Sequence, residues 1–173
     1  YRVNIPYGTW INGMCCTGFT YDEVAERLLA QDDTIVKIEV TDYNGKTHVL
    51  MLEKDLYTVS YKEPMMGAVA AFGAVGLFAE KTIFVEPVIT IDNAKWEEYA
   101  GNLDLFKAEK VQSVSRMMIV ETEQGFELKD AFAHTLDKEK ALQVLANAIE
   151  SGLKNISLVN ENCYYTPDYD EAD

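Results

Sequence analysis

Basic residues are scarce in this 173-residue chain. It has 15 lysines and arginines against 29 aspartates and glutamates, a formal net charge of −14 at pH 7. Nucleic-acid affinity comes mainly from Lys and Arg side chains that neutralise phosphates, and anionic lipid surfaces attract the same side chains. The charge therefore argues against a nucleic-acid partner and against docking on an anionic membrane. Part of the acidity is a C-terminal run, which we interpret as a solvated linker and not as a metal site: Asp168, Asp170, Glu171 and Asp173.

An apolar run long enough for a membrane span is also absent. One uncharged stretch covers residues 64–79, but a spanning helix needs about 20 apolar residues and three glycines interrupt this stretch. We therefore expect no membrane insertion by this segment, and a buried core helix over residues 65–78. Hydrophobic residues make up 48% of the sequence, which is typical of a folded chain that buries a core.

Cysteine and histidine are few, with three and two residues. A structural zinc site needs about four clustered ligands with recognisable spacing, and the sequence shows neither that spacing nor a Gly-rich phosphate loop. We therefore expect no metal and no cofactor. Cys163 lies in Asn-Cys-Tyr-Tyr, and neither His48 nor His134 neighbours a cysteine in sequence. A Cys–His pair assembled in space is the alternative, but the pattern favours a chain that is not an enzyme.

Capping signals and apolar periodicity predict four helices. Thr20-Tyr21-Asp22-Glu23 is a capping box, in which the Thr and Glu side chains each accept a backbone N–H of the other residue. Asp137 precedes the strongest helical pattern, and Gly152 is placed to end that helix in a left-handed conformation. The expected ranges are 21–30, 65–78, 93–100 and 138–151.

Turn signals divide the strands. Asn44-Gly45 stands between two apolar runs and tolerates the positive φ angles of a hairpin turn. Glu123-Gln124-Gly125 indicates a second hairpin, and Pro87 interrupts an apolar run, which suggests an edge or a bulge. Strands are expected near residues 35–40, 47–52, 83–91, 117–121 and 156–159. The stretch 102–114 is expected to be a connection.

The two halves of the chain share a capped helix followed by a strand. Thr20 corresponds to Asp137, and Leu28 corresponds to Leu145. This order of elements indicates an α+β fold, with two similar small units, each a capped helix packed on a mostly antiparallel sheet. The expected domains are an N-terminal unit, a second unit, and an exit segment with an acidic linker, over residues 1–80, 81–160 and 161–173.

Two stretches carry a resemblance to a known family. The first is Ile11-Asn12-Gly13, followed by Cys16-Thr17-Gly18-Phe19-Thr20 and Glu23-Val24; the second is Gly125-Phe126-Glu127, followed by Leu136-Asp137, Ala148-Ile149, Gly152 and the strand that ends at Val159. In this order they resemble the extracellular, non-catalytic, peptidoglycan-binding-like N-terminal region of bacterial L,D-transpeptidases and the related W-type vancomycin-resistance accessory proteins. The match covers most of the chain. One departure is Ala133-His134, where the family pattern has a glycine shortly before Leu136.

The resemblance implies a non-catalytic cell-envelope module that positions an L,D-transpeptidase catalytic domain on the cell wall. In such enzymes the nucleophilic cysteine stands in a Ser/Thr-His-Gly-Cys context in a separate domain, and this sequence has no such context. The implied partners are peptidoglycan or a following catalytic domain of the same chain. The implied location is extracellular, on the envelope of a Gram-positive bacterium, with an export or anchor segment before Tyr1. The alternative is an extracellular protein–protein interaction or spacer module with no glycan affinity.

A module that holds glycan directly would stack exposed aromatic rings on sugar faces. An aromatic ring offers a large apolar face, and a Tyr or Trp adds a polar group at its edge. Ordinary core or rim packing is the alternative for each ring. The candidate glycan-stacking residues are Trp10, Tyr164, Tyr165 and Tyr169.

An extracellular location also favours a disulfide, since bridges persist in oxidising surroundings. Cys15 and Cys16 are adjacent, and a bridge between neighbours is strained, so Cys163 is expected to be one partner. We expect Cys16 to be the other, because it stands two residues before Gly18, where related sequences often carry cysteine. Adjacent strand positions also point to opposite faces. Three reduced thiols are the alternative.

Overall fold

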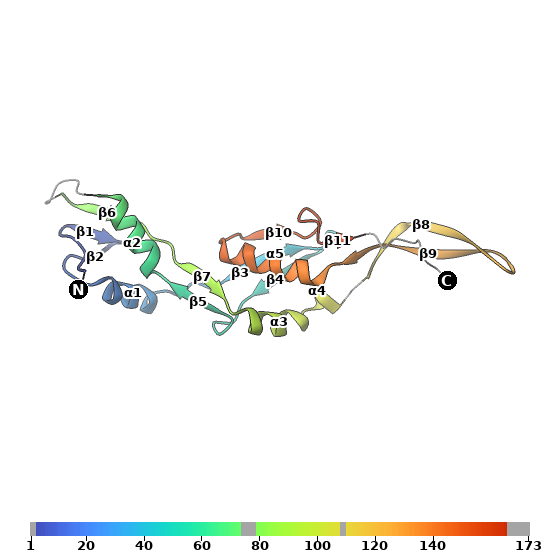
Figure 1. Cartoon of the computed structure of the whole chain (residues 1–173), viewed down its shortest axis with the longest axis horizontal. Coiled ribbons are helices and arrows are strands. Elements are labelled where there is room, and N and C mark those ends of the chain that lie inside the picture. The colour runs from blue at the N-terminus through green and yellow to red at the C-terminus, as the bar shows by residue number, and fades with distance from the viewer. Residues whose placement is uncertain (1–2, 74–78, 108–109, 166–173) are drawn as a thin grey trace. The chain divides into compact units, whose positions relative to one another are not determined.

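The computed structural model describes residues 3–73, 79–107 and 110–165 (Figure 1). The protein is a mixed α+β structure of helices and small sheets, as the sequence predicts. It forms two compact units, and both are discontinuous in sequence. The first unit contains residues 1–35 and 57–90, and the second contains residues 36–56 and 91–173.

The first unit contains a three-stranded sheet. β1 (Thr9–Ile11) is central, with β2 (Met14–Cys15) antiparallel on one side and β6 (Lys81–Ile83) parallel on the other. The turn between β1 and β2 is Asn12-Gly13, and both residues have positive φ angles, 46° and 81°. Glycine adopts this conformation freely and asparagine adopts it more readily than most residues.

The first unit also contains a two-stranded sheet, and one of its strands comes from the predicted strand 83–91. The run 83–91 was expected to be a strand interrupted at Pro87 by an edge or a bulge, and it divides into the end of β6 and β7 (Val88–Ile91). β7 forms a two-stranded sheet with β5 (Tyr57–Ser60), a strand for which no expectation was drawn from the sequence. Residues 84–87 between the two strands contain Pro87, which has no N–H to donate to a strand pairing.

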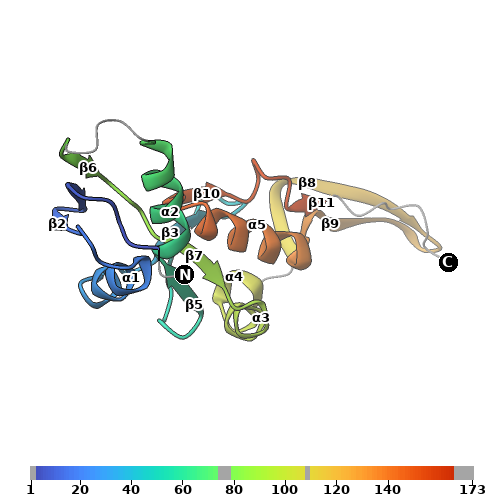
Figure 2. The same ribbon diagram turned by 60° about the vertical axis from the view of Figure 1, so that its left-hand side comes forward.

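In the described part of the first unit, the helices are α1 (Tyr21–Ala30) and α2 (Lys62–Ala71) (Figure 2). α1 matches the predicted range, and its capping box is formed: the Thr20 N–H donates to Glu23 Oε2 at 2.8 Å, and the Glu23 N–H donates to Thr20 Oγ1 at 3.2 Å. The buried face of α1 packs into a core with residues of the sheet and of the second helix. This core contains Ile5, Ile11, Cys16, Val24, Ala25, Leu28, Tyr61, Met65, Ile83 and Val85.

α2 (Lys62–Ala71) differs from the prediction of a buried core helix over 65–78. It begins three residues earlier, because Pro64 occupies its first turn, where a missing N–H costs no helical hydrogen bond. Met65 is buried, but Met66 and Phe72 are exposed, so the helix covers the core with one face. Residues 74–78 of the predicted helix lie outside the described residues.

The second unit contains another three-stranded sheet. β3 (Lys37–Thr41) is antiparallel to β4 (Thr47–Met51) and parallel to β10 (Asn155–Ser157). The Asn44-Gly45 hairpin is confirmed: Gly45 has φ +77°, and its N–H donates to Asp42 O at 3.1 Å. Alternate strand residues, among them Ile38, Val40 and Leu50, are buried.

The described part of this unit contains three helices. α5 (Lys138–Glu150) follows the N-cap Asp137, whose side chain accepts from Lys140 N, and it ends before Gly152 at φ +73°. α3 (Asn93–Gly101) also matches its prediction. α4 (Asp104–Lys107) lies in the stretch that was expected to be a connection.

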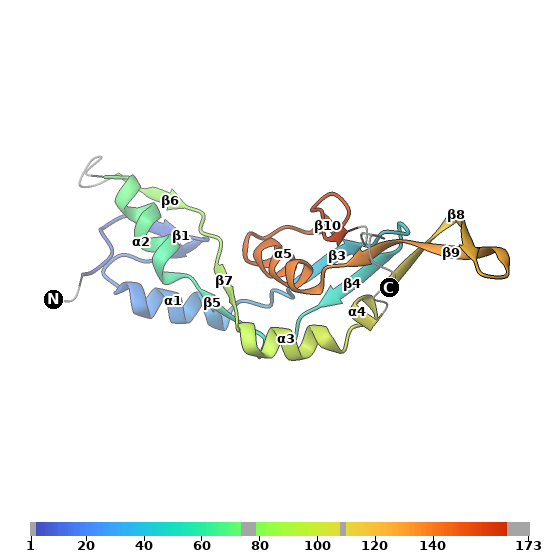
Figure 3. The same cartoon turned by 45° about the vertical axis from the view of Figure 1, so that its right-hand side comes forward.

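A long ribbon extends away from the N-terminal end of α5 (Figure 3). β8 (Lys110–Thr122) and β9 (Gly125–Leu136) form the predicted second hairpin, but both strands are much longer than expected. β11 (Tyr164–Tyr165) pairs antiparallel with the end of β9. The pairings β1–β2, β3–β4, β8–β9 and β9–β11 are antiparallel, as mostly antiparallel sheets require.

The parallel pairings explain why the units interleave. β6 pairs with β1, and β10 pairs with β3, in each case across a long stretch of sequence. The expected domains 1–80 and 81–160 therefore differ from the compact units, which exchange residues 36–56 and 81–90 across that boundary. That the two units are similar to each other stays a prediction. No helix among the described residues is both long and apolar enough to cross a membrane.

Candidate functional site

The four aromatic candidates have different environments. Trp10 lies on β1 and is 37% exposed, opposite Cys15 and Thr82 in the sheet. Tyr165 on β11 is 53% exposed. Tyr164 is partly buried, and Tyr169 lies outside the described residues.

Tyr164 is held by the turn between β3 and β4. The Tyr43 N–H donates to the Tyr164 hydroxyl at 3.2 Å, and the two rings meet edge to face with centroids 5.3 Å apart. Burial raises the pKa of Tyr164. The structure therefore gives Tyr164 a packing role, which was the alternative interpretation for this residue.

Tyr165 lines a hollow of ≈ 460 Å³ at the start of α5. The β9–β11 pairing places Tyr165 opposite Thr135, and the Asp137 N–H donates to Cys163 O at 2.8 Å, which fixes β11 beside the helix N-terminus. The other lining residues are Thr135, Leu136, Asp137, Lys138 and Glu139. An exposed ring and several polar side chains therefore share one concave surface.

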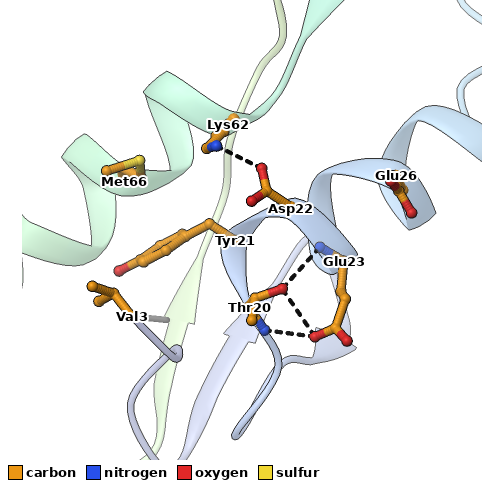
Figure 4. Close-up of a pocket in the computed structure, with 8 residues that line it drawn as sticks. All are labelled: Val3, Thr20, Tyr21, Asp22, Glu23, Glu26, Lys62 and Met66. Atoms are coloured by element: carbon orange, nitrogen blue, oxygen red, sulfur yellow. Dashed lines mark hydrogen bonds and ion pairs between the residues drawn. The ribbon is translucent and has the colours of Figure 1, made fainter. Parts of the chain in front are cut away.

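A second hollow, of ≈ 400 Å³, lies in the first unit (Figure 4). The ring of Tyr21 lies between Val3 and Met66, and Lys62 Nζ forms an ion pair with Asp22 Oδ1 at 2.6 Å. This bond raises the pKa of Lys62. The capping box uses Thr20 and Glu23, and Glu26 completes the lining. No local pattern in the sequence indicates this hollow, because its walls come from helices about 40 residues apart and each wall alone is an ordinary helix surface.

Both histidines lie in the second unit, near the β3–β4 turn. His48 Nε2 is 2.8 Å from Asp42 Oδ2, and the His134 ring contacts the Tyr43 ring with centroids 4.4 Å apart. Burial alone would raise the pKa of Asp42. The hydrogen bonds from His48 and from the backbone N–H groups of Lys46 and Asn44 outweigh burial and lower that pKa.

The structure does not contain the predicted Cys16–Cys163 bridge. All three cysteines are free thiols: Cys15 is exposed, and the other two are fully buried. Cys16 belongs to the core of the first unit and its thiol donates to Met14 O at 3.2 Å, while Cys163 belongs to the second unit and its thiol is 3.8 Å from Glu161 O. Each sulfur therefore packs within its own unit as a small apolar side chain.

The two buried thiols are not activated as nucleophiles by this geometry. Burial raises the pKa of Cys16 and that of Cys163, whereas a reactive cysteine needs a lowered pKa. Within residues 3–73, 79–107 and 110–165, no group of three or more His, Cys, Asp or Glu side chains is placed to hold a metal ion.

Comparison with known proteins gave no match: no family model, no curated protein and no solved structure is significantly similar to this chain.

Proposed function

We propose that this chain is a non-catalytic cell-envelope module of the peptidoglycan-binding-like kind that its sequence resembles, and that the hollow beside Tyr165 holds glycan. As in the region it resembles, the module would position a catalytic domain of the same chain against the cell wall. The support comes from the order of the sequence motifs and from the chemistry of the hollow.

The observation that carries the proposal is the half-exposed ring of Tyr165 beside a polar concave surface. A pyranose ring has an apolar C–H face and a rim of hydroxyl groups, so it needs one aromatic platform and several hydrogen-bonding side chains. Tyr165 offers the platform. Thr135 and Glu139 offer a hydroxyl and a carboxylate around a hollow of ≈ 460 Å³, and Asp137, whose Oδ1 accepts from Lys140 N, offers its second carboxylate oxygen.

Co-sedimentation with purified, insoluble peptidoglycan tests the proposal. The wild-type chain is expected in the pellet, and Tyr165→Ala is expected to weaken binding about fivefold, because a lost ring contact costs roughly 1 kcal/mol. Tyr7→Ala is the matched control, since Tyr7 is 67% exposed and lines neither hollow. Equal loss in both variants, or a wild-type chain that stays in the supernatant, would refute glycan binding at Tyr165.

The ribbon favours the second candidate function, a protein-interaction module. Ile119 and Phe126 are 69% and 74% exposed. The register pairs Phe126 with Glu121, which lies two positions after Ile119 on β8. Residues two apart on a strand point to the same face, so Ile119 and Phe126 lie on one face of the ribbon. Exposed apolar groups on one surface are typical of a protein interface. If the chain does not bind the wall, and Ile119→Ser with Phe126→Ser abolishes binding to an isolated catalytic domain of the same protein, this second function replaces the first.

A further inference from the structure

The chain has two Asn-Gly pairs, Asn12-Gly13 and Asn44-Gly45, and both form turns. Glycine has no side chain to shield its backbone nitrogen, so in such a pair this nitrogen can attack the side-chain carbonyl carbon of the preceding asparagine. The reaction requires the asparagine amide to be free to rotate toward the nitrogen. The two pairs differ in that freedom.

The amide of Asn12 is held on both sides. Its Nδ2 donates to Val85 O, and its Oδ1 accepts from Val85 N, each at 2.8 Å. Both bonds are partly buried, and they join the β1–β2 turn to the chain that follows β6. Attack by Gly13 would require both bonds to break.

The amide of Asn44 has no such restraint. Asn44 is exposed, and no hydrogen bond joins its side chain to another residue in the described part of the chain. The Gly45 nitrogen donates to Asp42 O at 3.1 Å, so it is released when the turn opens. Opening an exposed turn is a low-cost local fluctuation.

We propose that Asn44 is a site of spontaneous deamidation and that the fold protects Asn12 from the same reaction. The Gly45 nitrogen bonds to Asn44 Cγ, the bond from Cγ to Nδ2 breaks, and ammonia leaves with the proton of the Gly45 N–H. Water then opens the cyclic imide. Cleavage of the new bond at Cγ gives aspartate, and cleavage at the backbone carbonyl carbon gives isoaspartate, in which the main chain runs through the former side chain.

The isoaspartate product adds a methylene to the backbone of a turn that several hydrogen bonds hold, among them three that join it to Lys46, His48 and Tyr164. Lys46 N donates to Asp42 Oδ1 at 2.9 Å, His48 Nε2 lies 2.8 Å from Asp42 Oδ2, and Tyr43 N donates to the Tyr164 hydroxyl at 3.2 Å. A longer main chain at Asn44 cannot keep all three. The modification therefore loosens the attachment of the β3–β4 turn to β11.

Peptide mapping of aged protein tests the site. The folded chain is incubated at mildly alkaline pH, and a second sample is incubated in denaturant. In the folded sample, Asn44 is expected to lose its amide while Asn12 keeps it; in denaturant both are expected to react at similar rates. An Asn44 that stays intact in the folded protein, or an Asn12 that reacts as fast there or stays intact in denaturant, would overturn the proposal.

Two variants separate the added charge from the added methylene. Asn44→Asp carries the charge on a normal backbone, and Asn44→Gln keeps an amide that is too long for the five-membered ring. Aged wild type is expected to melt below Asn44→Asp, and aged Asn44→Gln is expected to keep its initial melting temperature. An aged wild type that melts with Asn44→Asp would overturn the loosening of the turn.

Discussion

Thr9 has an unusual buried hydroxyl. Thr9 is fully buried in β1. Its Oγ1 has no hydrogen-bond partner, and among the described residues no other buried side-chain nitrogen or oxygen lacks one. A buried polar group without a partner loses its hydration and gains no bond in return, which costs about 1–3 kcal/mol. Replacing the group by a methyl of similar shape removes that cost.

We therefore expect Thr9→Val to raise the free energy of unfolding by about 1 kcal/mol. Thr82→Val is the control, because Thr82 is exposed on the neighbouring strand and surface substitutions change stability by about 0.5 kcal/mol or less. Urea denaturation measures both variants. A Thr9→Val variant that is less stable than wild type would show that the hydroxyl has a bonding role.

The three cysteines give a second prediction at this scale. With Cys15 exposed and the other two thiols buried, a thiol reagent is expected to label Cys15 alone in the folded protein. It is expected to label all three in denaturant without reductant. Mass spectrometry counts the labels. One label in denaturant would instead reveal a bridge between two of the cysteines, and peptide mapping would identify the pair.

At the scale of elements, α3 and α5 are joined through Trp96. Its side chain is almost fully buried, and its Nε1 donates to Leu142 O at 3.1 Å. Trp96→Phe leaves a cavity and removes this bond, so we expect the free energy of unfolding to fall by about 2 kcal/mol. Tyr99→Phe on the same helix removes an exposed hydrogen bond to Met51 O, so its free energy of unfolding is expected to fall by less than that of Trp96→Phe. Thermal unfolding compares them, and a reversed order would contradict the packing described here.

The β3–β4 turn gives a prediction for pH. The pKa of Asp42 is lower in the folded chain than its ordinary value, so its ionised form stabilises the fold above the unfolded pKa of about 3.9. That contribution is lost as the pH falls through the folded pKa. Asp42→Asn removes the titrating group. Below about pH 4, the free energy of unfolding of this variant is therefore expected to fall less steeply with decreasing pH than that of wild type. Parallel slopes in pH-dependent denaturation would refute this role for Asp42.

At the scale of the whole molecule, the chain passes between the two units three times, near residues 35, 56 and 90. A fragment of residues 1–80 lacks β6 and the segment that follows it, so it lacks Ile83 and Val85 of the first core. We expect this fragment to be unfolded and a fragment of residues 1–90, which restores both, to show dispersed amide NMR signals. A folded fragment 1–80 would support the consecutive domains that the sequence suggests.

The expectation that the chain has no catalytic activity also concerns the whole chain, and it stays a prediction. Incubation with peptidoglycan fragments, followed by mass spectrometry of the products, tests it. Turnover that disappears in Cys163→Ala or in either histidine variant would show that the chain is an enzyme.

The sequence by itself determined the elements whose signals are local. The capping box at Thr20, the cap at Asp137 and the Asn44-Gly45 turn depend on bonds between residues a few positions apart, so their patterns identify them directly. The sequence also made Tyr165 a candidate for glycan stacking; its ring is exposed in the structure, and the stacking itself stays a prediction. The hollow beside it was not visible.

Only the tertiary structure decided the pairings between distant segments. β1 pairs with β6, and β10 pairs with β3, in parallel across long stretches of sequence that contain other helices and strands. No local signal specifies which strand a buried strand will join. Those pairings exchange segments between the expected domains. The burial of each cysteine within a core, the hollow between α1 and α2, and the clamp on Asn12 depend on the same long-range choices. A local sequence pattern cannot predict the environment of a side chain that such contacts create, because the contacting residues are neighbours only in the folded chain.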